Sequence, residues 1–175
     1  MSKRKQLALV VALLGALSCQ KSTPAAAPPP QPVTMITLDQ IQARLAEDKA
    51  AGRIAVLHMW ATWCGPCVEE FPELAKFQRD LLTNDKTVDF FAVSVDDPGN
   101  KDDVVKFVAD SGARFPVFIA DAPDQEAFAR GINPAWPSVL PTTFFYGTDG
   151  ATKDIVLGEI ESAAEFRKKI EATKK

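Results

Sequence analysis

Two predominantly apolar segments constrain the fold of this chain most. Residues 54–60 have the sequence IAVLHMW, and residues 88–95 have the sequence VDFFAVSV. Segments of this length, apolar at most positions and bounded by turn residues, are typical of strands buried on both faces of a sheet. Such a sheet needs helices on both sides. The two segments therefore predict an α/β fold in which a central mixed β-sheet is flanked by helices.

The rest of the chain supplies the helices and further strands. Periodicity and capping residues predict helices from a cap at Thr37 or Asp39 to about Ala51, and over residues 68–82, 102–110, 124–130 and 163–173. We expect Gly112 and Gly131 to end the third and fourth helices, and Ser162 and Glu165 to form a capping box for the last. Strands are predicted over residues 116–120, 142–146 and 154–157, the last two joined as a hairpin.

The composition excludes several classes of protein. A chain of 175 residues holds one globular domain and an appendage. With 20 Lys and Arg against 23 Asp and Glu, it offers no basic surface for nucleic acid. A mean hydropathy close to zero argues against a polytopic membrane protein. Three cysteines are too few for a disulfide-stapled miniprotein, so each needs its own explanation.

Residues 1–18 have the pattern of a signal peptide. Basic residues at positions 3–5 precede an apolar run over residues 7–17, which is shorter than a membrane-spanning helix requires. The sequence LGALS before Cys19 resembles a bacterial lipoprotein processing box, which predicts that Cys19 is lipidated. The alternatives are cleavage nearby, which leaves Cys19 as a free thiol, or an uncleaved anchor. Gln20 stands where an inner-membrane retention signal usually has Asp, which favours the outer membrane.

Residues 19–32 are expected to be a tether. The segment STPAAAPPPQP over residues 22–32 has no charge and no large apolar side chain, so it cannot form a core. In a polyproline-like form of ~3.1 Å per residue it would span roughly 30 to 35 Å. Plain disorder is the alternative, and the folded domain is predicted over residues 33–175.

The chemistry of the chain is concentrated in the motif Cys64-Gly65-Pro66-Cys67, at a predicted strand-to-helix junction. A helix N-terminus stabilises a thiolate, so Cys64 is expected to attack and Cys67 to resolve the mixed disulfide. Pro66 fits the first helical turn because its missing N–H has no acceptor there. A zinc site would need two further ligands, and the chain has one histidine, His58, and no second Cys pair, so we expect no metal.

The motif and its surroundings resemble the thioredoxin superfamily, and within it the TlpA/ResA-like membrane-tethered thiol–disulfide oxidoreductases. The resemblance rests on the run VLHMWATWCGPCVEEFPEL over residues 56–74, on VLPTTF over residues 139–144, and on an extra strand–helix segment between residues 92 and 130. It implies a thioredoxin fold with four or five strands and no cofactor beyond the redox-active Cys64–Cys67 disulfide. It also implies reduction or exchange of disulfides in exported proteins such as apocytochromes c.

The N-terminal segment with Cys19 and Gln20, together with the resemblance, predicts a cellular setting. The domain would be lipid-anchored on the periplasmic side of a bacterial cell envelope, at the outer membrane in preference to the inner. A membrane electron donor of the thiol-transfer type would recharge it, and its other partners would be exported thiol or disulfide proteins. We expect a monomer.

Two residues next to the motif take roles from the same resemblance. Pro141 matches the family's cis-proline, which presents the backbone of Leu140 to an extended substrate; a trans proline that starts an edge strand is the alternative. Glu70 matches an acid thought to influence the active-site thiols. Its alternative role is a favourable interaction with the helix dipole and nothing more.

His58 occupies an unusual position six residues before Cys64. Thioredoxins keep a buried acid there, and ResA-like proteins often carry Asn. Strand alternation places His58 on the same face as Ile54, Val56 and Trp60, beneath Cys67. The imidazole could take the proton that Cys67 loses when it attacks. A neutral, hydrogen-bonded core histidine is the alternative, and it is slightly preferred.

The remaining candidates concern substrate binding. Trp63 is expected to cover the thiols, and Gly65 and Pro66 are expected to form part of the substrate-binding surface. Trp136 lies in a proline-rich segment that leads to Pro141. It either lines a substrate groove or packs its loop onto the domain.

The direction of electron flow is not encoded in the motif. The same spacing serves couples from about -270 to about -120 mV, a difference of roughly 7 kcal/mol. The resemblance and the Gly65-Pro66 pair favour a reductase. A disulfide-forming oxidase is the first alternative. A non-enzymatic metallochaperone that binds copper through Cys64, Cys67 and His58 is the second.

Overall fold

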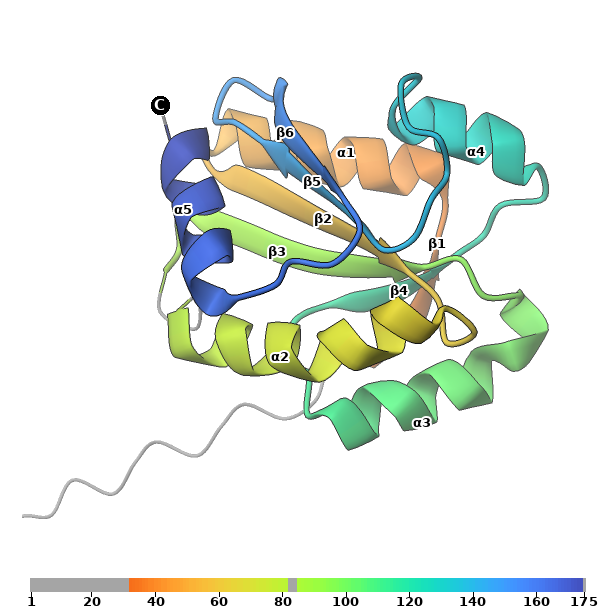
Figure 1. The fold of residues 1–175 in the computed structure, drawn as a ribbon. Coiled ribbons are helices and arrows are strands. Elements are labelled where there is room, and N and C mark those ends of the chain that lie inside the picture. The colour runs from red at the N-terminus through yellow and green to blue at the C-terminus, as the bar shows by residue number, and fades with distance from the viewer. Residues whose placement is uncertain (1–31, 82–84, 175) are drawn as a thin grey trace, which may run out of the picture.

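The computed structural model describes residues 32–81 and 85–174 (Figure 1). The predicted signal peptide, the lipidated Cys19 and nearly all of the tether lie outside the described residues. The elements in chain order are β1 (Thr34–Ile36), α1 (Leu38–Ala50), β2 (Ile54–Trp60), α2 (Gly65–Leu81), β3 (Val88–Ser94), a 3₁₀ turn (Pro98–Asn100), α3 (Lys101–Ser111), β4 (Val117–Ala120), α4 (Gln125–Ile132), β5 (Thr142–Tyr146), β6 (Thr152–Leu157) and α5 (Ala163–Thr173).

The strands form one mixed sheet in the order β1-β4-β3-β2-β5-β6. The first four are parallel, and β5 and β6 are antiparallel to their neighbours. The predicted central mixed sheet is confirmed, but the expected four or five strands were too few, because the described residues form six. The addition is β1, which pairs with β4 from Thr34 to Ile36. A strand of three residues carries no readable periodicity, so only its pairing partner reveals it.

Helices cover both faces of the sheet (Figure 1), as the buried strands required. Along β2, Val56 and Trp60 pack in the cluster that includes Cys67 and residues of α2, α3 and α5. Leu57 and Met59 pack in the other cluster, with α1 and α4. Every residue of β2 is buried. The alternation predicted for the segment 54–60 is therefore confirmed.

The helix ends follow the predicted caps with two corrections. Of the two candidates, Thr37 caps α1, and its side chain and that of Gln40 bond reciprocally to backbone N–H groups. Helix α4 continues through Gly131 to Ile132 and is not ended by the glycine. A Cβ at position 131 would collide with the Leu38 side chain, so Gly131 permits close packing of α4 on α1. Ser162 caps α5, but the Glu165 carboxylate accepts the N–H of Glu161, so the capping box is displaced by one residue.

Candidate active site

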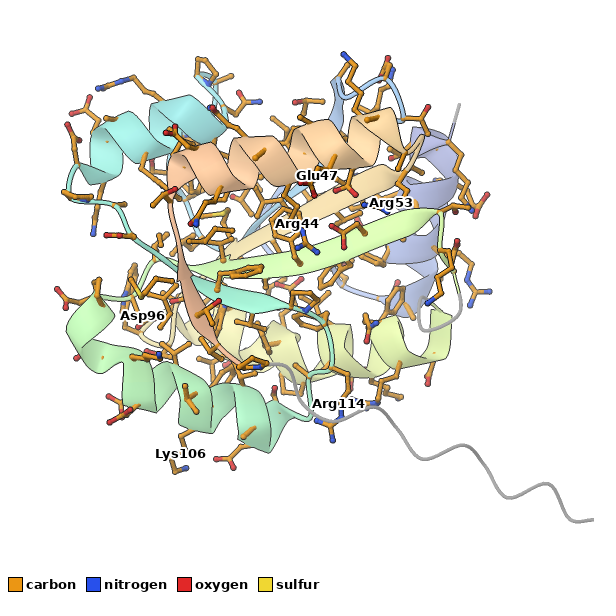
Figure 2. The ribbon with its side chains drawn as sticks, turned by 180° about the vertical axis from the view of Figure 1, so that it is seen from behind. Arg44, Glu47, Arg53, Asp96, Lys106 and Arg114 are labelled. Atoms are coloured by element: carbon orange, nitrogen blue, oxygen red, sulfur yellow. A yellow bond between two sulfur atoms is a disulfide. The ribbon has the colours of Figure 1, made fainter. Side chains whose placement is uncertain are left out.

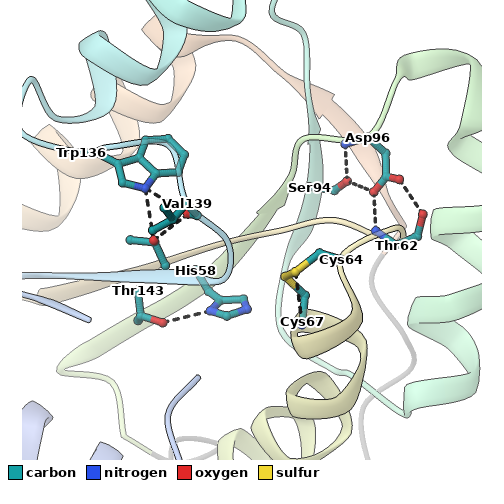
Figure 3. Close-up of a disulfide and its surroundings, with 10 residues drawn as sticks. His58, Thr62, Cys64, Cys67, Ser94, Asp96, Trp136, Val139 and Thr143 are labelled. Carbon is teal, nitrogen blue, oxygen red and sulfur yellow. Dashed lines mark hydrogen bonds between the residues drawn. A yellow bond between two sulfur atoms is a disulfide. The ribbon is translucent and has the colours of Figure 1, made fainter. Parts of the chain in front are cut away.

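Cys64 and Cys67 form a disulfide at the start of α2, after the short loop that follows β2 (Figure 3). The backbone N–H of Cys67 donates to the Sγ of Cys64 at 3.3 Å. Cys64 is 7% exposed and Cys67 is fully buried. An N–H directed at sulfur and the positive end of the helix dipole both stabilise a thiolate at Cys64 in the reduced state. Of the two sulfurs, only that of Cys64 is exposed enough to attack another molecule or to be attacked by one.

Exposed residues surround Cys64 on the surface. Gly65 and Pro66 are exposed, and Trp63 is the most exposed of the large apolar side chains in the described residues, at 67%. An indole held this far in solvent beside a reactive sulfur provides apolar area that a partner can cover. The structure thus places Trp63, Gly65 and Pro66 together around the disulfide.

The loop before β5 ends at a cis peptide bond between Leu140 and Pro141, as expected. Trp136 fastens this loop, because its Nε1–H lies 3.2 Å from the carbonyl oxygen of Val139 and 3.1 Å from Oγ1 of Thr142. The indole is only 7% exposed. It also borders a cavity beside the disulfide, so the structure gives Trp136 both of the positions that its sequence context left open.

His58 is fully buried on the face of β2 predicted for it. Its Nδ1 lies 3.0 Å from Oγ1 of Thr143, and Figure 3 shows the ring between Thr143 and the disulfide. Nε2 has no hydrogen-bond partner among the described residues. Burial lowers the pKa of His58 to about 3, so the imidazole is neutral at ordinary pH.

Glu70 is turned toward the connection between β6 and α5. Its Oε1 accepts the N–H of Ile160 at 2.8 Å, and the residue is 5% exposed. Burial raises the pKa of Glu70 to about 7, with smaller contributions from Glu159 and Glu165, while the N–H of Ile160 acts in the opposite direction. Its hydrogen bond joins α2 to a segment 90 residues away.

A buried carboxylate that sequence reasoning missed secures the loop before Cys64. Asp96 is 2% exposed, and it accepts bonds from the N–H of Thr62 at 2.9 Å and the hydroxyl of Thr62 at 2.5 Å (Figure 3). The Ser94 hydroxyl donates at 2.5 Å to Oδ2, the carboxylate oxygen that also accepts the Thr62 N–H. A signal was present: Ser94 ends and Asp96 follows a buried strand parallel to β2, and the carboxyl ends of parallel neighbours meet at one edge of the sheet.

A cavity of about 760 Å³ opens beside the disulfide. Trp63, Trp136 and Leu140 border it on one side, and the ends of β3 and β4 with the start of α4 border it on the other. The segment that the resemblance marked as additional, residues 92–130, thus builds one wall of the space next to Cys64.

Among residues 32–81 and 85–174, no group of three or more His, Cys, Asp or Glu side chains is arranged to hold a metal ion. In the same part of the chain, no helix combines the length and apolar character needed to cross a membrane.

A family model described as Redoxin matches residues 22–165. The chain belongs to the Redoxin family. This Redoxin chain is 36% identical over 107 residues to a thiol-disulfide oxidoreductase ResA from Geobacillus thermodenitrificans, covering 61% of the chain and 56% of the relative. It is 33% identical over 107 residues to a ResA from Bacillus subtilis, covering 61% and 54%. The chain therefore spans little more than half the length of these curated relatives.

Solved structures similar to the Redoxin chain have the same fold. A thiol:disulfide interchange protein of the thioredoxin family from Chlorobium tepidum matches with a TM-score of 0.60 and 22% identity, over 85% of this chain and 99% of that one. A DsbF homologue from Corynebacterium diphtheriae matches with a TM-score of 0.58 and 26% identity, over 73% and 75%. The predicted thioredoxin fold is confirmed.

Proposed function

We propose that this chain is a thiol–disulfide oxidoreductase that reduces or exchanges disulfides of exported proteins through Cys64 and Cys67. The observation that carries the proposal is the unequal pair at the start of α2: Cys64 is 7% exposed and accepts an N–H, while Cys67 is fully buried. An outer nucleophile and an inner resolving thiol are what two-step disulfide exchange requires. The names of the ResA relatives support the same chemistry.

The proposed reaction starts from the reduced pair. The Cys64 thiolate attacks one sulfur of a substrate disulfide, forming a mixed disulfide and releasing the other substrate sulfur as a thiolate that takes up a proton. Cys67 then loses its proton and attacks Cys64. This step closes the Cys64–Cys67 disulfide and releases the second substrate thiol. Two electrons pass from the protein to the substrate, and a thiol-transfer donor in the membrane must return them.

Neighbouring residues are proposed to orient the substrate. The backbone of Leu140, held before Pro141, would pair with an extended substrate strand, and Trp63, Gly65 and Pro66 would cover the attacked sulfur. All of them border the exposed side of Cys64 or the cavity beside it. Trp136 would keep the loop in position through its bonds to Val139 and Thr142.

His58 is proposed to accept a hydrogen bond from the thiol of Cys67 without taking its proton, because burial lowers the pKa of the imidazole to about 3. If Nδ1–H donates to Thr143, the unpartnered Nε2 is an acceptor on the side of the disulfide. A neutral imidazole also places no negative charge beside the thiol, unlike the buried acid of thioredoxins. Glu70, protonated over part of the neutral range, would influence the same helix turn.

The cellular setting belongs to the same proposal. Cys19 would carry a lipid, residues 19–32 would space a monomeric domain from the membrane, and the domain would act on the periplasmic side of the envelope. Apocytochromes c would be among its substrates. Metabolic labelling with a fatty-acid analogue, compared between the unaltered chain and Cys19→Ser, tests the anchor; label retained on Cys19→Ser would contradict it.

Insulin reduction by the chain, with dithiothreitol as donor, tests the activity. We expect Cys64→Ser to abolish turnover and Cys67→Ser to accumulate a mixed disulfide with the substrate, because the first exchange step survives only in the second variant. Cys19→Ser is the control and should keep full turnover. A chain that shows no turnover, with no mixed disulfide in Cys67→Ser, would contradict the proposal.

A redox titration against glutathione buffers tests the direction of electron flow. A potential near -270 mV supports the reductase, and one near -120 mV would make the protein an oxidase that uses the same pair.

A further inference from the structure

The cavity lies against Trp63 and Leu140, where we expect the residues that flank a substrate cysteine to lie. Two of its lining residues, Trp63 and Leu140, directly precede Cys64 and the cis-proline Pro141. Its volume of about 760 Å³ falls within the range of specific ligand sites. A polypeptide whose sulfur meets Cys64 therefore brings its neighbouring side chains to this opening.

The inner part of the cavity is apolar. Its apolar lining consists mainly of Val95, Ala120, Phe128, Ala129, Trp136 and Leu140. Phe128 and Trp136 are 5% and 7% exposed, so they form a fixed floor within the packed core. Such a floor favours a large aliphatic or aromatic side chain over a polar one, because burial of apolar area is worth about 25 cal/mol per Å².

The rim of the cavity carries negative charge. Asp97, Asp121 and Glu126 are exposed there, and the described residues that line the cavity include no Lys, Arg or His. Glu126 is paired with Arg130 on the exposed surface of α4, and Asp97 accepts the N–H of Gly99. The Asp121 carboxylate makes no hydrogen bond or ion pair with the described part of the chain.

We propose that this cavity selects the substrate: it binds an extended polypeptide segment with a large apolar side chain next to the reactive cysteine and a Lys or Arg within about three residues of it. The apolar floor takes the first side chain, and the carboxylates of Asp97 and Asp121 attract the second. The inference rests on the proposed function and adds a substrate class to it.

Symmetrical peptide disulfides test the proposal, because attack on either sulfur then gives the same product. Three peptides are compared as dimers: acetyl-Gly-Lys-Leu-Cys-Lys-Gly-amide, its analogue with both Lys replaced by Glu, and its analogue with Leu replaced by Ser. With the reduced, unaltered chain we expect kcat/KM to fall about tenfold for each analogue. Raising the salt to 0.5 M should shrink the Lys-over-Glu ratio and leave the Leu-over-Ser ratio in place.

Variants of the chain test whether the preference for the Lys peptide arises at the cavity. In Asp97→Asn/Asp121→Asn we expect the Lys-over-Glu ratio to fall at least threefold. Glu47→Gln is the control for charge away from the cavity: it removes one exposed negative charge, against two in the double variant, at the opposite end of the sheet and should leave the ratio unchanged. Equal rates for the Lys and Glu peptides with the unaltered chain, or equal losses in the double variant and in Glu47→Gln, would overturn the proposal.

A small, uncharged disulfide distinguishes a failure of the proposed substrate class from a failure of the proposed oxidoreductase function. If the unaltered chain reduces 2-hydroxyethyl disulfide but does not discriminate among the peptides, the substrate class is wrong and the oxidoreductase stands. If it reduces neither the small disulfide nor any peptide, the proposed function itself fails.

Discussion

The two ends of the parallel strands differ in how their charged side chains are arranged. At the carboxyl ends of β2, β3 and β4 lie the disulfide, the buried Asp96 and the acidic, apolar cavity. At the amino ends a polar hollow of about 360 Å³ is lined by Arg44, Arg53 and Arg114 together with acidic residues. Figure 2 labels these arginines toward one end of the molecule and Asp96 toward the other.

The charges at the amino end are largely paired within the protein. Arg44 makes two bonds to Asp89, at 2.7 and 2.8 Å, and its guanidinium lies 4.7 Å from the ring centre of Phe91. Arg53 binds the buried Asp48 at 2.6 Å. Burial raises the pKa of Asp48 to about 6, although the hydrogen bond from Arg53 acts in the opposite direction. These pairs join α1 to the strands it covers.

At the carboxyl end, apart from the exposed Glu126–Arg130 pair, the polar groups named above are held by neutral donors or left to the solvent. Asp96 is bound by N–H and hydroxyl groups, His58 is neutral, and the Asp121 carboxylate faces the cavity opening. Similar residue types therefore stabilise the domain at the amino end, whereas at the carboxyl end they surround the site that we propose for a substrate. Substitutions at the two ends should therefore separate stability from turnover.

The largest effect is expected for Asp96→Ala. The change removes an acceptor of three hydrogen bonds and deprives the buried Ser94 and the half-buried Thr62 of their partner, so we expect a loss of about 4 kcal/mol of unfolding free energy. Because Thr62 belongs to the loop before Cys64, turnover should fall as well. Urea unfolding and insulin reduction measure the two effects, and full turnover in a destabilised variant would contradict the positioning role.

A pH-dependent effect follows from Glu70. Its pKa is raised from 4.5 to about 7 in the folded protein, so the folded state binds more protons than the unfolded state between these values. Its contribution to stability is therefore present below about pH 4.5 and is lost as the pH rises to about 7. Glu70→Gln should gain about 3 kcal/mol relative to the unaltered protein between pH 4.5 and pH 8.

Denaturant unfolding across that pH range measures the difference for Glu70→Gln. His58 has a lowered pKa and opposes the trend, but it is present in both proteins and cancels from the comparison. A difference that does not change with pH would show that Glu70 titrates normally.

Asp48→Ala provides the counterpart at the amino end. Loss of the Arg53 bond should destabilise the protein by about 2 kcal/mol, less than a fully buried pair because Arg53 is 38% exposed. The free energy of unfolding at pH 7 measures this loss. We expect kcat/KM for insulin to stay within twofold of the unaltered value, since the Asp48–Arg53 pair lies at the end of the parallel strands opposite to the disulfide. A large loss of turnover would contradict the proposal that the amino end contributes to stability and not to turnover.

The smallest effect is expected for His58→Asn, which can keep the contact with Thr143 but removes the acceptor on the other side of the ring. Turnover should fall about tenfold, equivalent to about 1.4 kcal/mol, and its pH dependence should shift. Quenched samples should contain more mixed disulfide, because the step of Cys67 is slowed. Unchanged turnover and pH dependence would identify His58 as a packing residue only.

Local patterns predicted much of the fold and the centre of the site. The strand–CGPC–helix junction, the face on which His58 lies, and the caps at Thr37 and Ser162 all depend on residues within four positions of one another. The limits of local reasoning appear at Gly131, where a contact with Leu38, and not a helix end, explains the glycine. A glycine at this position fits either a helix end or a close contact between helices. Only its neighbours in the folded structure show which of the two applies.

Residue chemistry and short-range periodicity were enough to predict the Cys64–Cys67 pair, its place at a helix start and the layered α/β architecture. Tertiary structure alone decided that β1 joins β4, that Asp96 secures the Thr62 loop and that Glu70 bonds to Ile160. It also decided the cavity that we propose as the substrate site. These features join segments 34 to 90 residues apart, and strand register and helix packing, which no local pattern encodes, bring such segments together.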